Sequence, residues 1–174
     1  MDHDRYPERY IRGILNEVRT IAMVGASANP VRPSYFAMMY LLEKGYDVIP
    51  VNPREAGKEI LGKTVYEKLA DIPGTVDMVD IFRNAEAAGP LTDEAIEIGA
   101  KVVWMQLSVR NDEAARKAEA AGLKVVMNRC PKMEYGKLSG EWGWLGCVSG
   151  IISSRRRELT GSRIQSLSIG SRKH

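Results

Sequence analysis

Continuous apolar stretches alternate along the chain with stretches in which apolar residues recur every three or four positions. The first pattern is typical of buried strands and the second of amphipathic helices. Five stretches have the continuous pattern and are predicted strands: 20–25, 47–53, 76–82, 101–107 and 123–130. The helical spacing predicts helices over 7–18, 33–44, 86–99 and 111–122, and residues 54–75 are expected to form short pieces. Strands and helices that alternate in this way favour a parallel sheet covered on both faces.

Glycine, proline and asparagine mark where several of these elements begin or end. Asn111 or Asp112 is the predicted N-cap of the helix over 111–122, and Gly122 fits the position just after its end. Pro90 is expected near the first turn of its helix, where proline is tolerated. Pro50 is awkward for a central strand, so we expect it to mark the exit end of the second strand.

These elements predict a single α/β domain with a Rossmann-like, doubly wound parallel sheet of about five strands. We expect the strand order 3-2-1-4-5, with the helices after strands one and four on opposite faces and Gly25 at the switch point. The domain is expected to span 1–152. Residues 153–174 lose the apolar periodicity and are expected to form a flexible tail.

Charge is distributed unevenly between these two parts. The tail has six Lys and Arg residues against one Glu, so the remaining chain has a formal charge of −2 although the whole carries +3. A domain of this charge does not favour nucleic acid as a partner. No apolar run approaches the length of about 20 residues that a membrane helix needs, and the charged N-terminus lacks the apolar core of a signal peptide.

The cysteines and histidines limit the available chemistry. Cys130 and Cys147 alone make no disulfide framework, which fits a reducing compartment, and we expect a cytoplasmic protein. His3 and His174 are the only histidines and lie near the two ends, so no usual zinc spacing is present. Without a histidine base inside the chain, Ser and Cys nucleophiles have no triad partner. The sequence therefore predicts neither a catalytic site nor a metal site.

Ligands of doubly wound sheets bind beyond the carboxyl ends of the strands. The loop after the first strand, GASANPVRPS, places Gly25 and Ser27 at the first two positions of a dinucleotide-binding loop but has Pro30 at the third. Backbone N–H groups with Ser27 and Ser34 hydroxyls can face a pyrophosphate there, and Arg32 adds positive charge. An ordinary strand-to-helix turn with Ser34 as the N-cap is an equally good interpretation of this loop alone.

The end of the second strand narrows the choice of nucleotide. An NAD site has an acidic residue about 20 residues after the glycine loop, whereas this chain has Asn52, Pro53 and Arg54 there, with Lys58 just beyond. A basic neighbourhood suits a phosphorylated ribose. NADP and coenzyme A both carry one.

Five segments together resemble the small, stand-alone CoA-binding proteins of bacteria and archaea, which are similar to the CoA-binding domain of the succinyl-CoA synthetase α subunit. They are GASANPVRPSYF, VIPVNPREAGKEILG, VDMVDIFR, AKVVWMQLSVRNDEAARKAEAAGLKVV and NRCPKMEY. The resemblance covers about residues 8–140 and implies coenzyme A as the ligand. The ligase works through a phosphorylated histidine in a second domain, which this chain lacks, so the resemblance implies binding without ligase chemistry.

The resemblance also implies which residues contact CoA. The loop over 25–27 would face the pyrophosphate, with 32–34 beside it, and the residues after the second strand would border the adenosine and a phosphate. The ends of the later strands would line the adenine and the pantetheine arm and close the site, although many relatives have Asp where this chain has Asn128. The implied cofactor-binding residues are Gly25, Ala26, Ser27, Arg32, Pro33, Ser34, Asn52, Pro53, Lys58, Ile81, Phe82, Arg83, Gln106, Asn128, Arg129 and Cys130.

We therefore expect a non-catalytic protein that binds CoA or an acyl-CoA at the carboxyl edge of the sheet. Two alternatives stay open at this point: an NADP-binding oxidoreductase, and a protein-interaction module on a nucleotide-binding fold. Trp142 and Trp144 are expected either to anchor the C-terminal segment on the domain or to form a homodimer contact. A structural role for Cys130 is favoured over a reactive one, and Cys147 fits a packed position.

Overall fold

The structure is a computed structural model that describes residues 1–140. The expectations about Trp142, Trp144 and Cys147, about the tail over 153–174 and about a domain boundary after 152 lie outside the described residues.

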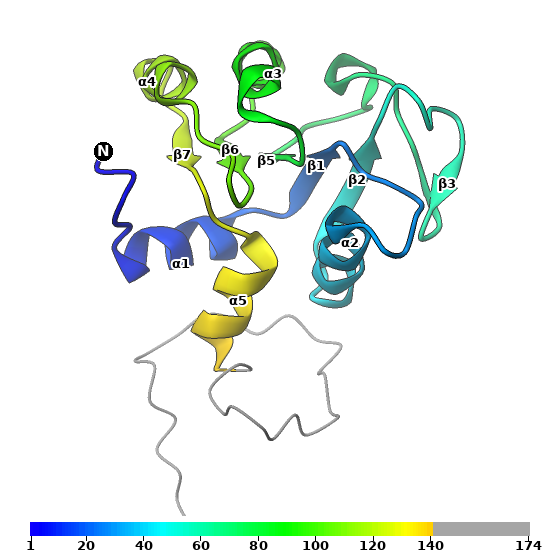
Figure 1. Ribbon diagram of the computed structural model, residues 1–174, viewed down its shortest axis with the longest axis horizontal. Coiled ribbons are helices and arrows are strands. Elements are labelled where there is room, and N and C mark those ends of the chain that lie inside the picture. Colours follow the sequence, from blue (N-terminus) through cyan, green and yellow to red (C-terminus); the bar gives the residue numbers. More distant parts are fainter. Residues whose placement is uncertain (141–174) are drawn as a thin grey trace, which may run out of the picture.

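Five parallel strands form one sheet in the order β2-β1-β5-β6-β7. Their bounds are β1 Thr20–Val24, β2 Asp47–Val51, β5 Met78–Ile81, β6 Val102–Met105 and β7 Lys124–Val126. One face is covered by α1 (Glu8–Glu17), α2 (Pro33–Glu43) and α5 (Pro131–Ser139), and the other by α3 (Ala85–Glu97) and α4 (Asp112–Ala120) (Figure 1). The Rossmann-like α/β fold is confirmed, and α2 and α4 lie on opposite faces as expected.

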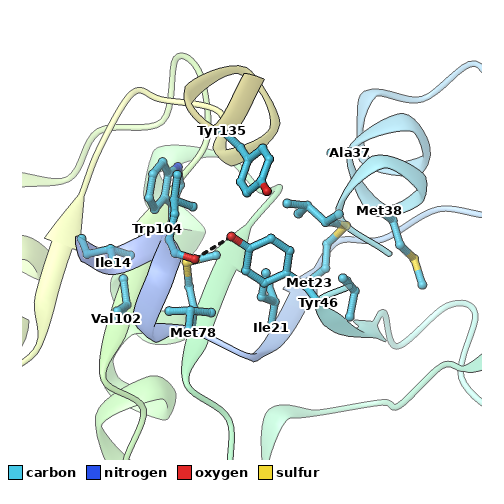
Figure 2. Close-up of a cluster of buried hydrophobic side chains, with 14 of the residues drawn as sticks. Ile14, Ile21, Met23, Ala37, Met38, Tyr46, Met78, Val102, Trp104 and Tyr135 are labelled. Carbon is cyan, nitrogen blue, oxygen red and sulfur yellow. Dashed lines mark hydrogen bonds between the residues drawn. The ribbon is translucent and has the colours of Figure 1, made fainter. Parts of the chain in front are cut away.

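The sheet separates two apolar cores because successive strand residues point to opposite faces. Figure 2 shows the core on the side of α1, α2 and α5, where Met23, Met78 and Trp104 of neighbouring strands pack beneath Tyr135. The Tyr46 hydroxyl is buried there and donates a hydrogen bond to the carbonyl oxygen of Leu15 at 2.6 Å. The core on the α3 and α4 side is built mainly from alanine, valine, isoleucine and methionine.

The third strand does not lie where the sequence suggested. The expected order placed 76–82 beyond the second strand, whereas β5 pairs with β1 on the side opposite β2. The connection from β2 to β5 packs through Leu69 and Ile72 on the face that α3 and α4 cover, while α2 covers the other face. A right-handed crossover on that opposite face places β5 on the far side of β1 from β2. Because 54–75 has no helical periodicity, its apolar pattern did not reveal this face.

Pro50 explains why β2 lies at the edge. It is the penultimate residue of β2, close to the expected exit end, and its carbonyl oxygen accepts a hydrogen bond from the N–H of Tyr66 at 3.0 Å. Tyr66 lies on the outer side of β2, where it forms an isolated bridge with Val51. The missing N–H of Pro50 therefore interrupts no ladder with another long strand.

Smaller elements complete the described part of the chain. Strands β3 (Glu59–Ile60) and β4 (Lys63–Thr64) pair antiparallel, and a 3₁₀ turn, η1, spans Leu69–Asp71. Helix α5 was not expected, since 123–130 was interpreted as one long strand and no helix was placed after it. It begins with Pro131 in the first turn and ends at Gly140, whose φ is +80°.

Helix ends mostly follow the sequence signals. The Asn111 side chain accepts a hydrogen bond from the N–H of Ala114 at 3.0 Å, which makes it the N-cap of α4, and Gly122 has a φ of +89° just after the helix. Pro90 lies in the second turn of α3, one turn later than expected. None of the helices in the described part is long and apolar enough to cross a lipid bilayer.

Candidate functional site

The carboxyl ends of β1, β2 and β5 surround a polar cavity of about 480 Å³. Its wall combines the loop after β1, the start of α2 and the residues that follow β2 and β5. The lining residues are Gly25, Ser27, Arg32, Pro33, Ser34, Asn52, Arg54, Glu55, Phe82 and Arg83. This is the position at which ligands of doubly wound sheets bind.

Gly25 is required where β1 passes into this cavity. Its φ is +87°, and a Cβ there would lie 2.5 Å from the carbonyl oxygen of Phe82 and 3.1 Å from its carbonyl carbon. Backbone atoms of a neighbouring strand end cannot move away cheaply. The chain therefore needs glycine for close packing against Phe82 as well as for the turn.

Asn52 joins the loops after β1 and β2. Its Nδ2 donates a hydrogen bond to the carbonyl oxygen of Ala26 at 2.7 Å, and its Oδ1 accepts one from the N–H of Arg54 at 3.0 Å. The Ser27 hydroxyl accepts a hydrogen bond from the N–H of Asn29 at 3.2 Å, which shapes the first loop from within. Both loops are thus held in place by hydrogen bonds within the chain.

Helix α2 presents its first turn to the polar cavity without a side-chain cap. Its N-cap is Arg32, Pro33 is the first helical residue, and no side chain accepts a hydrogen bond from the first turn. The ordinary turn with Ser34 as N-cap is therefore wrong, since Ser34 lies inside the helix. An uncapped helix start offers N–H groups and a partial positive charge to an anion.

Three arginines add full positive charge to this cavity. Arg32, Arg54 and Arg83 all line it and are exposed. Within residues 1–140, none of the three guanidinium groups forms an ion pair or a hydrogen bond. Glu55, which also lines the cavity, pairs instead with Lys58 at 3.3 Å. The cavity therefore offers unused donors that suit phosphate oxygens.

An apolar cavity of about 570 Å³ adjoins the polar one and shares Pro33, Phe82 and Arg83 with it. It lies between the starts of α2 and α5. Its other lining residues are Phe36, Ala37, Gln106, Leu107, Val109, Cys130, Lys132 and Met133. Phe36, Leu107 and Met133 stand out among large apolar side chains because each is about half exposed.

The floor of the apolar cavity holds buried polar groups. Gln106 is 6% exposed, and its Nε2 donates to both carboxyl oxygens of Asp80, at 2.9 and 3.1 Å. Burial raises the pKa of Asp80 to about 8, and the hydrogen bond from Gln106 opposes this rise. Burial also raises the pKa of the Cys130 thiol, against the effect of the Met133 N–H at the start of α5.

A third cavity, the side cavity, opens on the other side of Gly25 and has a volume of about 390 Å³. It lies between the end of β2, η1 and α3. Its lining residues are Val24, Gly25, Val51, Pro53, Glu67, Lys68, Leu69, Arg83, Ala87, Pro90, Leu91 and Glu94. Arg83 lines all three cavities, so they adjoin one another at its side chain, and the three together are called the cleft.

A comparison with known families matches residues 19–136 to the CoA binding domain family. This chain belongs to that family. An uncharacterized Bacillus subtilis protein, YneT, is 34% identical over 125 residues, covering 72% of this chain and 91% of YneT. A solved structure of a hypothetical protein from Pyrococcus horikoshii has a TM-score of 0.73 and 43% identity, covering 78% of this chain and 94% of that one.

The link to CoA ligases is also confirmed. The α subunit of an ADP-forming acetate–CoA ligase from Pyrococcus furiosus is 36% identical over 89 residues. These residues are 49% of this chain but only 19% of the ligase subunit. The CoA-binding domain described here thus corresponds to one part of that larger enzyme.

Most residues implied by the family resemblance line the cleft of this CoA-binding domain. Of the residues on the first three loops, Ala26 is buried beneath its loop and Ile81 lies in the core on the α3 side. Ile81 and Phe82 are consecutive and point to opposite sides, so only Phe82 lines the cleft. Lys58 is exposed, pairs with Glu55 and lines none of the three cavities.

The implied residues after β7 also divide into one that lines the cleft and two that do not. Cys130 lines the apolar cavity, whereas Arg129 packs over the ring of Tyr6 and lines a separate cavity of about 330 Å³ beside the N-terminal segment. Asn128 has a φ of +52°, and its Oδ1 accepts a hydrogen bond from the N–H of Ser108 at 2.8 Å. It positions the loop after β6 and lines none of the three cavities.

Sequence reasoning missed several cleft residues of the CoA-binding domain. Phe36 and Met133 had no assigned role, and Leu107 was placed at the end of the predicted strand over 101–107. Asp80 lies inside the predicted strand over 76–82 and had no assigned role. The available signal was its spacing. Asp80 lies two residues before Phe82, and Gln106 lies two residues after Trp104, the neighbour of Asp80 in the sheet, so these side chains share one face.

Proposed function

We propose that this domain binds coenzyme A or an acyl-CoA in an extended conformation along the cleft and does not catalyse a reaction. The observation that carries the proposal is the arrangement of the cleft itself. Three arginines that form no ion pair within residues 1–140 and an uncapped helix start surround its polar centre, and an apolar cavity adjoins each side. Coenzyme A has the same order: adenine, a highly charged phosphate centre, and a long, mostly apolar arm.

The parts of CoA can be assigned by chemistry. The diphosphate and the 3′-phosphate suit the polar cavity, with its guanidinium groups and the N–H groups of α2. The adenine suits the side cavity, where Pro53, Leu69 and Leu91 offer apolar contact. The pantetheine arm suits the apolar cavity, where Gln106 can bind an amide group. The thiol or acyl group would then lie near Leu107 and Met133.

Two observations support binding without catalysis. Within the described chain, no histidine lines the cleft, and His3 instead contacts the Tyr6 hydroxyl at 2.8 Å and Glu119 at 3.4 Å. The thiol of Cys130 lines the cleft, but burial raises its pKa and keeps it protonated at neutral pH. We expect no release of free thiol from acetyl-CoA above the rate in buffer, and enzyme-dependent release would contradict this part of the proposal.

Isothermal titration of one preparation with CoA, dephospho-CoA, NADP and ATP tests the ligand. CoA is expected to bind most tightly because, of the four ligands, only CoA combines adenine and the arm with both the diphosphate and the 3′-phosphate. Dephospho-CoA is expected to be weaker and ATP, without the arm, weaker still. If NADP binds more tightly than CoA, the cleft is a dinucleotide site, and if no ligand binds, a protein-interaction role replaces the proposal.

A further inference from the structure

Asp80 and Gln106 form a buried pair beneath the apolar cavity. Asp80 belongs to β5, and its side chain is fully buried. Gln106 directly follows β6 and is both nine-tenths buried and part of the cavity wall. Nε2 of Gln106 lies within hydrogen-bond distance of both Oδ1 and Oδ2 of Asp80, so one of its N–H groups is directed at the carboxyl group.

Among residues 1–140, no cationic side chain forms an ion pair with Asp80. Its neighbours across the sheet are Met23 on β1 and Trp104 on β6. Just before α5, Cys130 lies close enough for the Asp80 carboxyl group to contribute to the raised pKa of its thiol. Arg83 and Lys132 line the cavity above but form no ion pair with Asp80 in the described structure. Gln106 is therefore the one group within residues 1–140 that donates a hydrogen bond to this carboxyl group.

This arrangement fixes what Gln106 offers to a ligand. Because Nε2 is held by Asp80, Oε1 is left as the other end of the amide, and within residues 1–140 it accepts no hydrogen bond. Oε1 is reached from the cavity, where a donor on a bound ligand can replace water as its hydrogen-bond partner. The amide N–H groups of pantetheine are such donors.

We propose that Asp80 is a positioning residue for the pantetheine arm, whose carboxylate holds Gln106 so that Gln106 Oε1 accepts a hydrogen bond from an amide N–H of the arm. This inference rests on the proposed function, because it takes CoA as the ligand. Asp80 itself does not line the cavity and acts through Gln106 alone.

Protonation of Asp80 changes the amide orientation. A protonated carboxyl group has an O–H that must be donated, and Gln106 Oε1 is the acceptor beside it. The amide then turns, and Nε2 faces the N–H of the arm instead of Oε1. Burial raises the pKa of Asp80 to about 8. In the free protein its carboxyl group is therefore mostly protonated at pH 7 and mostly ionised at pH 9. CoA affinity should therefore increase with pH, by up to about tenfold over this range.

The test compares two ligands from pH 7 to pH 9. S-methyl-CoA carries the arm without a titrating thiol, and adenosine 3′,5′-bisphosphate lacks the arm. For the parent protein we expect the affinity for S-methyl-CoA to increase about tenfold relative to the bisphosphate. In Asp80→Asn, which cannot ionise, this ratio should stay constant with pH and remain close to the parent's value at pH 7. Unchanged bisphosphate affinity shows that the rest of the cleft is intact.

A double-mutant cycle separates positioning from general support of the fold. Gln106→Met should weaken S-methyl-CoA binding at pH 9 by about tenfold, and adding Asp80→Asn should have no further effect. An additive effect, or the same pH dependence in Asp80→Asn as in the parent, would overturn the role of Asp80 while leaving CoA binding intact. Absence of any binding of S-methyl-CoA or CoA by the parent would overturn both this inference and the proposed function.

Discussion

At the scale of single residues, the cleft depends on groups that have one specific neighbour. Gly25 passes so close to Phe82 that a Cβ would meet its carbonyl oxygen at 2.5 Å. Asn52 uses both ends of its amide to join two loops. The three arginines of the polar cavity, by contrast, have no partner within the described chain. Backbone geometry is thus settled by internal contacts, and the charged groups are left for a ligand.

Gly25→Ala should destabilise the domain by about 1–3 kcal/mol more than Gly74→Ala. Both glycines have nearly the same backbone strain, with φ values of +87° and +90°, but nothing lies within 4 Å of a Cβ at Gly74. The difference therefore measures the contact with Phe82. Chemical denaturation of both variants gives the two free energies of unfolding, and equal losses would show that the close approach to Phe82 is absent in solution.

The 3′-phosphate should be recognised by Arg54, because it follows β2 and lines the polar cavity. CoA is then expected to bind about tenfold or more tightly than dephospho-CoA, the size of a charge-assisted hydrogen bond. Arg54→Met should remove most of this preference. Lys58→Met is the matched control, since Lys58 lies four residues further on but outside the cleft. If Lys58→Met loses the preference and Arg54→Met keeps it, Lys58, which the sequence suggested, recognises the 3′-phosphate.

At the scale of elements, both edges of the sheet are closed by side chains or short segments. Tyr66 covers the outer side of β2. On β7, the Tyr10 hydroxyl donates a hydrogen bond to the carbonyl oxygen of Val125 at 3.1 Å and accepts one from its N–H at 3.0 Å. The Tyr6 hydroxyl accepts another from the N–H of Met127 at 2.7 Å. The N-terminal helix thus replaces a sixth strand and discourages pairing with other chains.

Tyr10→Phe should lower the free energy of unfolding by about 1–3 kcal/mol, because both backbone groups of Val125 lose their partner. CoA affinity should not change, since Tyr10 lines none of the three cavities. Tyr66→Phe serves as the control, because the Tyr66 hydroxyl makes no hydrogen bond within the described chain. Thermal and chemical denaturation provide the comparison. Equal stability of the two variants would contradict the role of Tyr10 at the edge.

Apart from helix α5, the helices and long strands could be predicted from the sequence, because continuous apolar strands and three-to-four spacing of helices are strong patterns. The strand order could not, since the face covered by the irregular connection before β5 left no periodic signal. Pro50 was the clue to an edge strand. The loops that line the cleft are among those that the sequence placed at the carboxyl ends of the strands. The side toward which consecutive residues such as Arg129 and Cys130 point could not be predicted, because it depends on where each strand ends, and the sequence marks strand ends only to within a few residues.

At the scale of the whole molecule, two helix starts and four strand ends converge on one cleft. The starts of α2 and α5 flank the apolar cavity, and the ends of β1, β2, β5 and β6 form its floor and the polar cavity beside it. Membership of the CoA binding domain family agrees with this arrangement. Arg83 lies at the centre, because it is shared by all three cavities.

The most direct test of CoA binding in this cleft is the dissociation constant of CoA for Arg83→Met, measured by isothermal titration beside the parent protein and Arg116→Met. Methionine keeps the apolar stem and removes the charge. Arg116 is exposed on α4 and lines none of the three cavities. Arg83→Met should weaken CoA binding by about tenfold or more, and Arg116→Met should leave it unchanged. If folded Arg83→Met binds CoA as tightly as the parent, CoA does not occupy this cleft.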